Sequence, residues 1–186
     1  MQILKTKIPD LLIVEPDVFK DDRGYFFESY NHQRYQDRGI DPEFVQDNIS
    51  SSVRGVVRGL HYQLAPYAQG KLIQVLKGTV LDVAVDLRKG SPTFGDYLAL
   101  ELSEDTHRQF YIPQGFAHGF SVLSKEAVFS YKCDNYYNKE SERGINFLDP
   151  SLSIDWQIPE NKIIVSPKDQ ALPTMKEAEI NFVFRN

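Results

Sequence analysis

The chain has 186 residues, 41% of them hydrophobic and 25% charged, which is typical of a soluble globular protein and predicts one domain over 1–186. The formal net charge of −5 disfavours a general nucleic-acid-binding or membrane-binding surface, so any phosphate-binding basic residues must be local. The single cysteine, Cys133, excludes an internal disulfide, and no long apolar run precedes the first charges, so we expect a cytoplasmic protein without a membrane span.

The N-terminal third predicts a turn, a helix and a polar cluster. Asp-Asp-Arg-Gly at 21–24 indicates a tight turn into a strand, where Arg23 is either solvated or paired with a phosphate. The segment 28–39 fits one short helix that ends at its terminal glycine. The polar run 46–48 either recognises a base or ribose or forms a loop that satisfies its own backbone.

The middle of the chain alternates apolar and polar residues with the period of two that is typical of β-strands. In 79–88, every second residue from Leu81 to Leu87 is apolar, whereas Asp82 and Asp86 lie on the other face. The turn Lys77-Gly78 joins this strand to the one before it. Further strands are predicted at 55–63, 71–76, 96–103, 109–113, 117–124 and 127–133.

The C-terminal segments 149–156 and 166–173 indicate turns with single helical turns. No repeat or linker divides the chain. The expected fold class is therefore all-β, an antiparallel jelly roll with a few short helices.

A metal site is the first chemistry that such a fold suggests. Pro113, Gly115 and His118 resemble the second half of the cupin signature, Pro-x-Gly-x-x-His. The first half needs a second histidine two residues after the first, and Gln63 stands there after His61. Because a metal needs three or four convergent ligands, we predict no metal.

His61 and Lys71 are the candidate catalytic pair. Histidine is suited to general-base catalysis at neutral pH, and a nearby ammonium stabilises the oxyanion that forms when a proton leaves carbon beside a carbonyl. A hairpin would bring Lys71, on the next strand, near His61, and Asp82 on the following strand would keep the lysine charged. The alternative for His61 and for His118 is a buried imidazole that is hydrogen-bonded to the backbone.

Strict alternation places Arg58 and His61 on opposite faces of their strand. A bulge at Gly59 would re-aim one of them.

Tyr131 and Asp169 complete the candidate chemistry. Tyr131 shares a face with Phe129 and Cys133, so it is either a core side chain or a proton donor. Asp169 is either part of a turn after Pro167 or the group that orients His61.

Nine motifs occur in order and together cover about 14–169. They are DDRGYFFE, FVQDN, VRGLHYQ, QGKLIQV, DVAVDLRKGSPTFG, IPQGFAHGF, YKCDNYY, ERGI and SPKD. In these motifs and in their order, the chain resembles the dTDP-4-dehydrorhamnose 3,5-epimerase family.

The resemblance implies a cupin-like jelly-roll homodimer that needs no cofactor and no metal. The implied substrate is a dTDP-4-keto-6-deoxyhexose, epimerised at C3 and C5. The implied catalytic residues are the base His61 with Asp169, the enolate-stabilising Lys71 and the proton donor Tyr131. The segment around Arg23 is expected to contribute to the partner's site. The implied substrate-binding residues are Arg23, Phe26, Glu28, Gln46, Asp47, Asn48, Arg58, Lys71, His118, Tyr137, Glu142 and Lys168.

Three alternatives stay open at the level of sequence. A mono-epimerase or keto-isomerase acting on a related dTDP-4-keto-6-deoxysugar would use nearly the same residues. A metal-dependent oxygenase is disfavoured by Gln63, and a non-catalytic nucleotide-sugar-binding module would not need His61.

Overall fold

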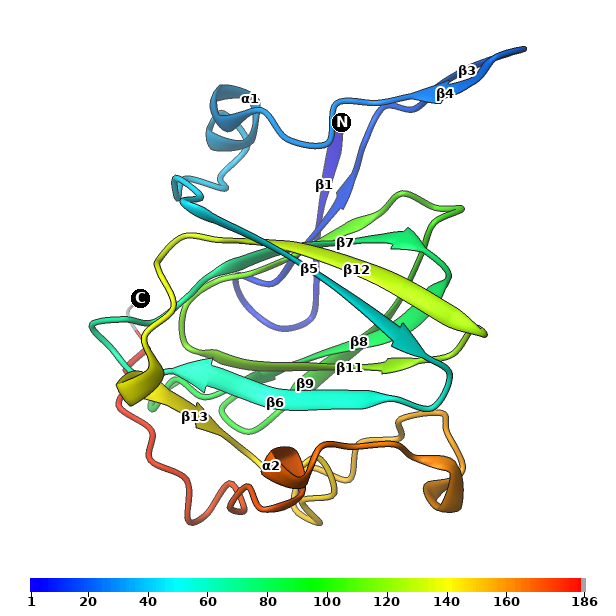
Figure 1. Ribbon diagram of the computed structural model, residues 1–186. Helices are drawn as coiled ribbons and strands as arrows, with labels where there is room; N and C mark the ends of the chain where they lie inside the picture. Colours follow the sequence, from blue (N-terminus) through cyan, green and yellow to red (C-terminus); the bar gives the residue numbers. More distant parts are fainter. Residues whose placement is uncertain (185–186) are drawn as a thin grey trace.

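The computed structural model describes residues 1–184 and is built from two antiparallel sheets that face each other (Figure 1). The six-stranded sheet consists, in spatial order, of β1 (Gln2–Lys5), β2 (Leu12–Glu15), β10 (Gln109–Ile112), β7 (Lys71–Lys77), β12 (Glu126–Cys133) and β5 (Gln46–Val53). The five-stranded sheet consists of β13 (Glu142–Gly144), β6 (Val57–Gln63), β11 (Phe116–Val122), β8 (Thr79–Asp86) and β9 (Tyr97–Ser103). This arrangement confirms the predicted all-β jelly roll.

The remaining elements are short. A hairpin of β3 (Phe19–Asp21) and β4 (Gly24–Phe26) projects from the body beside the N-terminal strands (Figure 1). The helical elements are α1 (His32–Gln36), η1 (Lys139–Ser141), η2 (Glu160–Lys162) and α2 (Pro167–Gln170). The predicted turn, the predicted helix before Gly39 and the helical turn within 166–173 are all present. Among the described residues, no helix is long and apolar enough to cross a membrane.

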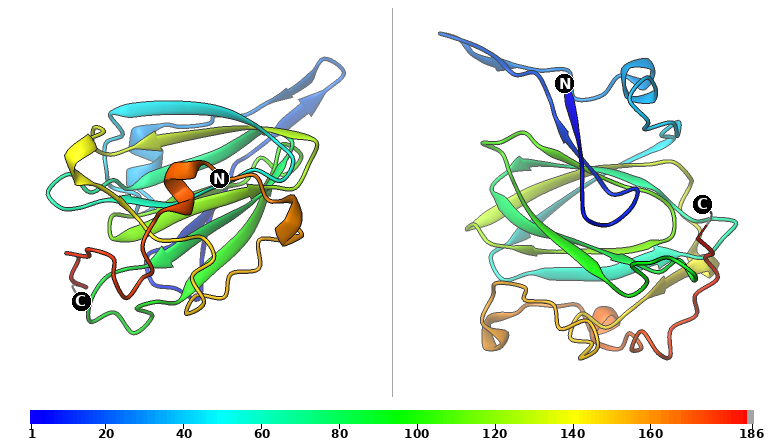
Figure 2. Two further views of the ribbon diagram at one scale, coloured as in Figure 1. Left: turned by 60° about the horizontal axis from the view of Figure 1, so that its bottom comes forward. Right: turned by 180° about the vertical axis from the view of Figure 1, so that it is seen from behind.

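Alternation along the strands sorts side chains into an interior and two outer layers. On β8, Val80 and Ala84 enter the core between the sheets, whereas Leu81, Val83 and Val85 pack on the outer face of the five-stranded sheet. That outer face is covered by the C-terminal segment, which runs beneath it in Figure 1 and in the right view of Figure 2. Both faces of β8 are therefore buried, including the face that carries Asp82 and Asp86.

The outer face of the six-stranded sheet carries a third apolar cluster, in which Tyr35 of α1 and Ile40 pack on Leu72 and Tyr111. The N-terminal segment thus lies on one outer face of the sandwich and the C-terminal segment on the other (Figure 2). One end of the space between the sheets stays open for a site.

The expected hairpin of β6 and β7 is wrong, because these two strands belong to different sheets. The chain passes from β7 to β8 at Gly78, where the sequence places a turn, and these two strands also belong to different sheets. The run 46–48 is not a loop, since it begins the strand β5, which pairs with β12 along its whole length. Strands of this kind are hard to predict because polar residues can occupy an edge strand as readily as a loop.

Candidate active site

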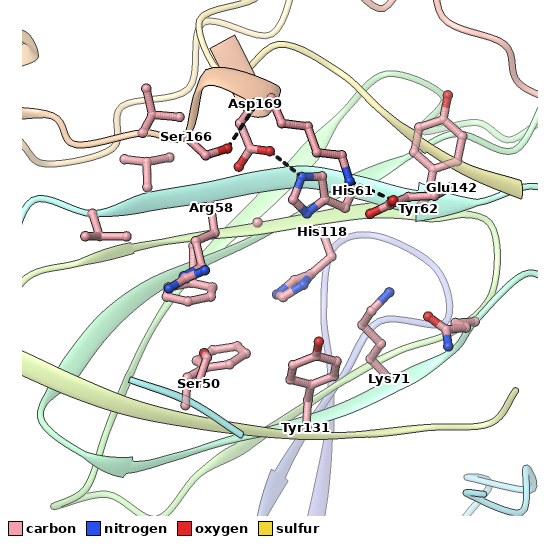
Figure 3. A pocket seen from close by; sticks show the side chains of 18 of the residues that line it. Ser50, Arg58, His61, Tyr62, Lys71, His118, Tyr131, Glu142, Ser166 and Asp169 are labelled. Atoms are coloured by element: carbon pink, nitrogen blue, oxygen red, sulfur yellow. Dashed lines mark hydrogen bonds and ion pairs between the residues drawn. The ribbon is translucent and has the colours of Figure 1, made fainter. Parts of the chain in front are cut away.

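A cavity of about 570 Å³ opens between the two sheets. The five-stranded sheet contributes Arg58, His61 and His118, and the six-stranded sheet contributes Lys71 and Tyr131. Figure 3 shows these side chains pointing toward one another from the two walls. The predicted catalytic residues therefore meet across the sandwich rather than along one hairpin.

Arg58 and His61 share the pocket face because β6 carries a bulge. On β11 the partners of these two residues are Phe120 and His118, so three residue steps on β6 face two steps on β11. The extra residue reverses the alternation after Arg58. The expected bulge at Gly59 is thereby confirmed.

Only glycine fits at this bulge. Gly59 has φ +114°, and a Cβ there would lie 2.6 Å from both Gly119 Cα and the His118 carbonyl oxygen. The bulge turns Leu60 outward into the core beneath the C-terminal segment, so that His61 points inward.

His61 forms an ion-pair-type hydrogen bond with a carboxylate from a remote segment. Its Nε2 lies 2.8 Å from Oδ1 of Asp169, whose side chain is 6% exposed. The other oxygen, Oδ2, accepts the Gly59 N–H at 3.3 Å, so the bulge also holds the orienting carboxylate. Ser166 caps α2 by accepting the Asp169 N–H at 3.1 Å, which fixes the helical turn that carries the carboxylate.

Burial alone would raise the pKa of Asp169, but hydrogen bonds from His61, Gly59 and Ser166 hold this pKa below its ordinary value. The carboxylate is therefore ionised at neutral pH. It fixes the imidazole orientation and leaves Nδ1 of His61 as the nitrogen that can accept a proton.

Lys71 is a nearly buried amine on the opposite wall. It begins β7 and is paired across the sheet with Cys133. Burial lowers the pKa of Lys71, an effect that Cys133, Asp134 and Asp82 oppose. Burial raises the pKa of the Cys133 thiol to about 11, so at neutral pH this free cysteine is uncharged.

Asp82 is not the direct partner of Lys71. It is completely buried and binds Nε2 of His118 through Oδ2 at 2.9 Å. Burial raises the pKa of Asp82, and His118 and then Lys71 oppose that rise. The carboxylate thus primarily fixes the second pocket imidazole and acts on Lys71 only at longer range.

Tyr131 stands on β12 next to the apolar floor formed by Phe129. Burial raises the pKa of its phenol, so the hydroxyl keeps its proton at neutral pH. In Figure 3 the hydroxyl points across the cavity toward the wall that carries His61 and His118. Tyr131 is therefore a neutral phenol that faces the two pocket imidazoles.

Three polar residues that are hydrogen-bonded to one another lie at the mouth of the cavity. Glu142 Oε2 accepts hydrogen bonds from Tyr137 Oη at 2.9 Å and from Lys168 Nζ at 2.7 Å. Burial raises the pKa of Glu142, but these two bonds outweigh it and bring the pKa below its ordinary value. All three residues line the same cavity as His61.

The structure does not bring every predicted residue to this cavity. Arg23 and Phe26 lie on the projecting hairpin, where the Arg23 side chain is 90% exposed and pairs with Asp21. Glu28 pairs with Arg34 near α1.

The three residues of the polar run on β5 divide between the two faces of their sheet. Asp47 faces outward and pairs with Lys132. Gln46 and Asn48 face the interior, where Gln46 Oε1 accepts the Tyr137 N–H at 2.9 Å and Asn48 Nδ2 lies 3.7 Å from Cys133 Sγ.

Sequence reasoning missed several residues of the cavity. Ser166 was detectable, since Ser-Pro-x-Asp is a helix-start pattern. Gln63 shares the pocket face of β6 with His61 by simple alternation. Ser50 and Gln69 also line the cavity, and only the tertiary fold brings them there.

A metal centre has little support from the residues. Within 1–184, no group of three or more His, Cys, Asp or Glu side chains is placed to hold a metal ion. His61 and His118 each bind a carboxylate of their own, and Gln63 binds backbone groups. The arrangement suits proton transfer instead: a base held by a carboxylate, an opposed phenol and a buried ammonium.

Comparison with known proteins gives one consistent result. The family model for dTDP-4-dehydrorhamnose 3,5-epimerase matches residues 5–177. A Shigella flexneri protein of that name is 55% identical over 170 residues, which cover 91% of this chain and 93% of the relative.

Solved structures agree. The crystal structure of dTDP-4-dehydrorhamnose 3,5-epimerase from Elizabethkingia anophelis NUHP1 has a TM-score of 0.91 and 56% identity, covering 95% of this chain and 97% of the other. The Legionella pneumophila Philadelphia 1 enzyme, solved with dTDP-4-keto-L-rhamnose, has a TM-score of 0.91 and 52% identity, covering 95% and 93% of the two chains. As its nine motifs predict, the chain belongs to the dTDP-4-dehydrorhamnose 3,5-epimerase family.

Proposed function

We propose that this pocket inverts C3 and C5 of dTDP-4-dehydro-6-deoxyglucose to give dTDP-4-dehydro-L-rhamnose. The observation that carries the proposal is the opposition of the His61–Asp169 pair on one wall to Tyr131 and Lys71 on the other. Inversion needs a base and an acid on opposite faces of one carbon, and the two sheets supply one each.

Each inversion is a balanced pair of proton transfers. Nδ1 of His61 removes the proton from the carbon beside the C4 ketone, and the electron pair moves onto the ketone oxygen as an enolate. The ammonium of Lys71 stabilises that oxygen, and Asp169 stabilises the imidazolium. Tyr131 then protonates the carbon from the opposite face. Solvent returns a proton to the phenolate and takes one from the imidazolium before the second carbon reacts.

The basic residues at the cavity are suited to the diphosphate. Arg58 lies at the outer part of the pocket, anchored by a 3.1 Å bond from Nε to Ser52 Oγ, and Lys168 lies at the mouth. A guanidinium forms bidentate bonds with phosphate oxygens, and the ammonium of Lys168 can exchange its contact with Glu142 for one with phosphate. We assign His118, held by Asp82, to a contact with the sugar.

We further propose a homodimer in which the hairpin β3–β4 reaches the partner's pocket. The hairpin stands away from its own body, with Phe19 64% and Phe26 69% exposed (Figure 1). The outer face of β5 also exposes apolar side chains, with Ile49 at 69% and Val53 at 57%. Apolar surface of this kind is typical of subunit interfaces.

Incubation of the sugar nucleotide with the protein in D₂O tests the reaction. We expect deuterium at both C3 and C5, detected by NMR. His61→Ala should lose exchange, whereas His32→Ala is the matched control, because His32 is exposed and its ring hydrogen-bonds with Tyr30 on the outside of the six-stranded sheet, away from the cavity. Exchange at neither carbon would contradict the proposal, and label at one carbon would indicate a mono-epimerase.

Mixed dimers test the contribution of the hairpin. If Arg23 serves the partner's site, mixing Arg23→Ala with His61→Ala chains creates one complete site in each mixed dimer, about a quarter of all sites after random exchange. If Arg23 acts in its own subunit, every site lacks one residue and mixing restores nothing. Analytical ultracentrifugation measures the dimer itself, and a monomer at working concentration would contradict the assembly.

A further inference from the structure

Gln63 is a buried amide whose hydrogen-bonding groups are all used. Its side chain is 4% exposed. Nε2 donates to the Tyr67 carbonyl at 2.6 Å and to the Tyr136 carbonyl at 3.2 Å, and Oε1 accepts the Asn138 N–H at 2.7 Å. A carboxamide has two N–H donors, so no other uncharged side chain of this length satisfies all three backbone groups.

These three backbone groups belong to two loops that cross between the sheets. The loop 64–70 leads from β6 to β7, and the loop 134–138 leads from β12 toward β13. The loops also bind each other, since Gln69 Nε2 donates to the Asn135 carbonyl at 2.8 Å and Asn135 Nδ2 donates to the Pro66 carbonyl at 3.2 Å. The side chain of Gln63 therefore hydrogen-bonds to both loops.

Tyr137 is the residue that this network places at the mouth of the cavity. Its own N–H is held by Gln46 from the six-stranded sheet, and the next N–H along the chain is held by Gln63 from the five-stranded sheet. Its hydroxyl donates to Glu142. The ring is 54% exposed and still lines the cavity, so backbone bonds rather than core packing determine where it stands.

We propose that Gln63 is a positioning residue that, together with Gln46, clasps the Tyr137 loop and so retains the sugar nucleotide between two successive proton exchanges. This inference rests on the proposed double epimerisation. After the first inversion, release of the once-inverted sugar competes with the second exchange. A loop fixed over the mouth slows release, whereas a loose loop lets the once-inverted sugar leave.

The test compares two buried glutamines. Gln63→Met removes three hydrogen bonds from the loops, and Gln109→Met is the matched control. Gln109 is 2% exposed and also uses both ends of its amide, with Tyr35 Oη, the Ser29 carbonyl and Gln74 as partners, but it lies on the outer side of the six-stranded sheet. The measured quantity is the ratio of singly to doubly deuterated product in a single turnover in D₂O.

We expect this ratio to rise about tenfold in Gln63→Met, because a network of this size shifts a closed loop toward open by at least one decade. In Gln109→Met the ratio should stay as in the wild type, whatever the loss of stability. A folded Gln63→Met protein with the wild-type ratio overturns the inference, and so does an equal rise in Gln109→Met.

A second variant keeps the test open if Gln63→Met does not fold. Gln46 is only partly buried and contributes one acceptor to the Tyr137 N–H, so Gln46→Met should fold and raise the ratio in the same direction. No rise in that variant overturns the inference. Failure of the proposed function is distinguishable, because then the wild type itself labels neither carbon.

Discussion

Lys71→Met should make the protein more stable and its exchange reaction much slower. Lys71 is 8% exposed, and its ammonium lies among Cys133, Asp134 and Asp82. The two carboxyl groups, Asp134 and Asp82, do not compensate for burial, since the pKa of Lys71 is lowered overall. The charged form is therefore less favourable in the folded protein than in water.

The expected gain follows from removing that charge while keeping the volume of the side chain. Replacement of a buried ion pair by apolar side chains of similar volume is often neutral or stabilising by about 1–4 kcal/mol, and we expect about 1–2 kcal/mol for Lys71 alone, because Asp82 and Asp134 remain and lose a favourable neighbour. Loss of an oxyanion-stabilising cation should lower the exchange rate by about 10²- to 10³-fold.

The pH dependence has a definite sign. The pKa of Lys71 in the folded protein lies below its ordinary value of 10.5. At pH values between these two pKa values, the unfolded chain binds more protons than the folded protein does. The stability of the wild type therefore rises with pH in that window. The advantage of Lys71→Met should therefore be largest at neutral pH and shrink as pH approaches 10.5.

Urea unfolding at pH 7, 9 and 10, followed by circular dichroism, measures this difference. Lys77→Met is the control on the same strand, since Lys77 is exposed and its hydrogen bond with Glu126 raises its pKa, so no gain is expected. A lower stability of Lys71→Met at pH 7, or a gain that does not change with pH, would refute the reasoning.

Three further predictions concern the His61–Asp169 pair, Tyr131 and Glu142 at the mouth of the cavity. Asp169→Asn should lower kcat for exchange by about 10²- to 10⁴-fold with little change in KM. Because the pKa of Asp169 is lowered in the folded protein, its carboxylate stabilises the wild type above about pH 4, and this stability is lost as pH falls further. Asp169→Asn should lack this contribution, which urea unfolding at pH 7 and pH 3 would measure. In Tyr131→Phe, His61 can still exchange a proton on one face, so NMR should detect label with retained configuration while inversion falls about 100-fold or more. Glu142→Gln should change unfolding free energy by less than about 1 kcal/mol, because Lys168 is 60% exposed, while KM changes, as steady-state kinetics would detect.

The central strands were predictable because their patterns are strong and local. The alternation on β8 follows from the side-chain period of a strand, and the Gly59 bulge follows from the backbone angles that glycine allows. Sheet membership was not predictable in the same way. The short loop 64–70 suggested a hairpin, yet it crosses between sheets, because β6 and β7 each find better partners elsewhere.

The same difference between local patterns and tertiary pairing applies to the candidate site. His61 was identified from its residue type and Asp169 from a motif more than 100 positions away, a separation that only the fold bridges. Asp82 was assigned to Lys71 from strand order, but pleating places its side chain against His118 on the neighbouring strand. Local patterns determine which face a side chain occupies, whereas tertiary pairing determines its partner.

The division of the chemistry between two sheets has a physical consequence. The wall built by β6 and β11 carries two imidazoles, each held by its own carboxylate, and the facing wall carries the phenol and the ammonium. Within each sheet the strands are joined by hydrogen bonds, and the inner faces of the two sheets pack against each other in one apolar core. In the proposed mechanism, the core between the sheets sets the distance between base and acid, so that a planar enolate can lie between them without either side chain moving far. A site built along one hairpin would place both groups on the same face of the sugar, where a proton can be exchanged but a centre cannot be inverted.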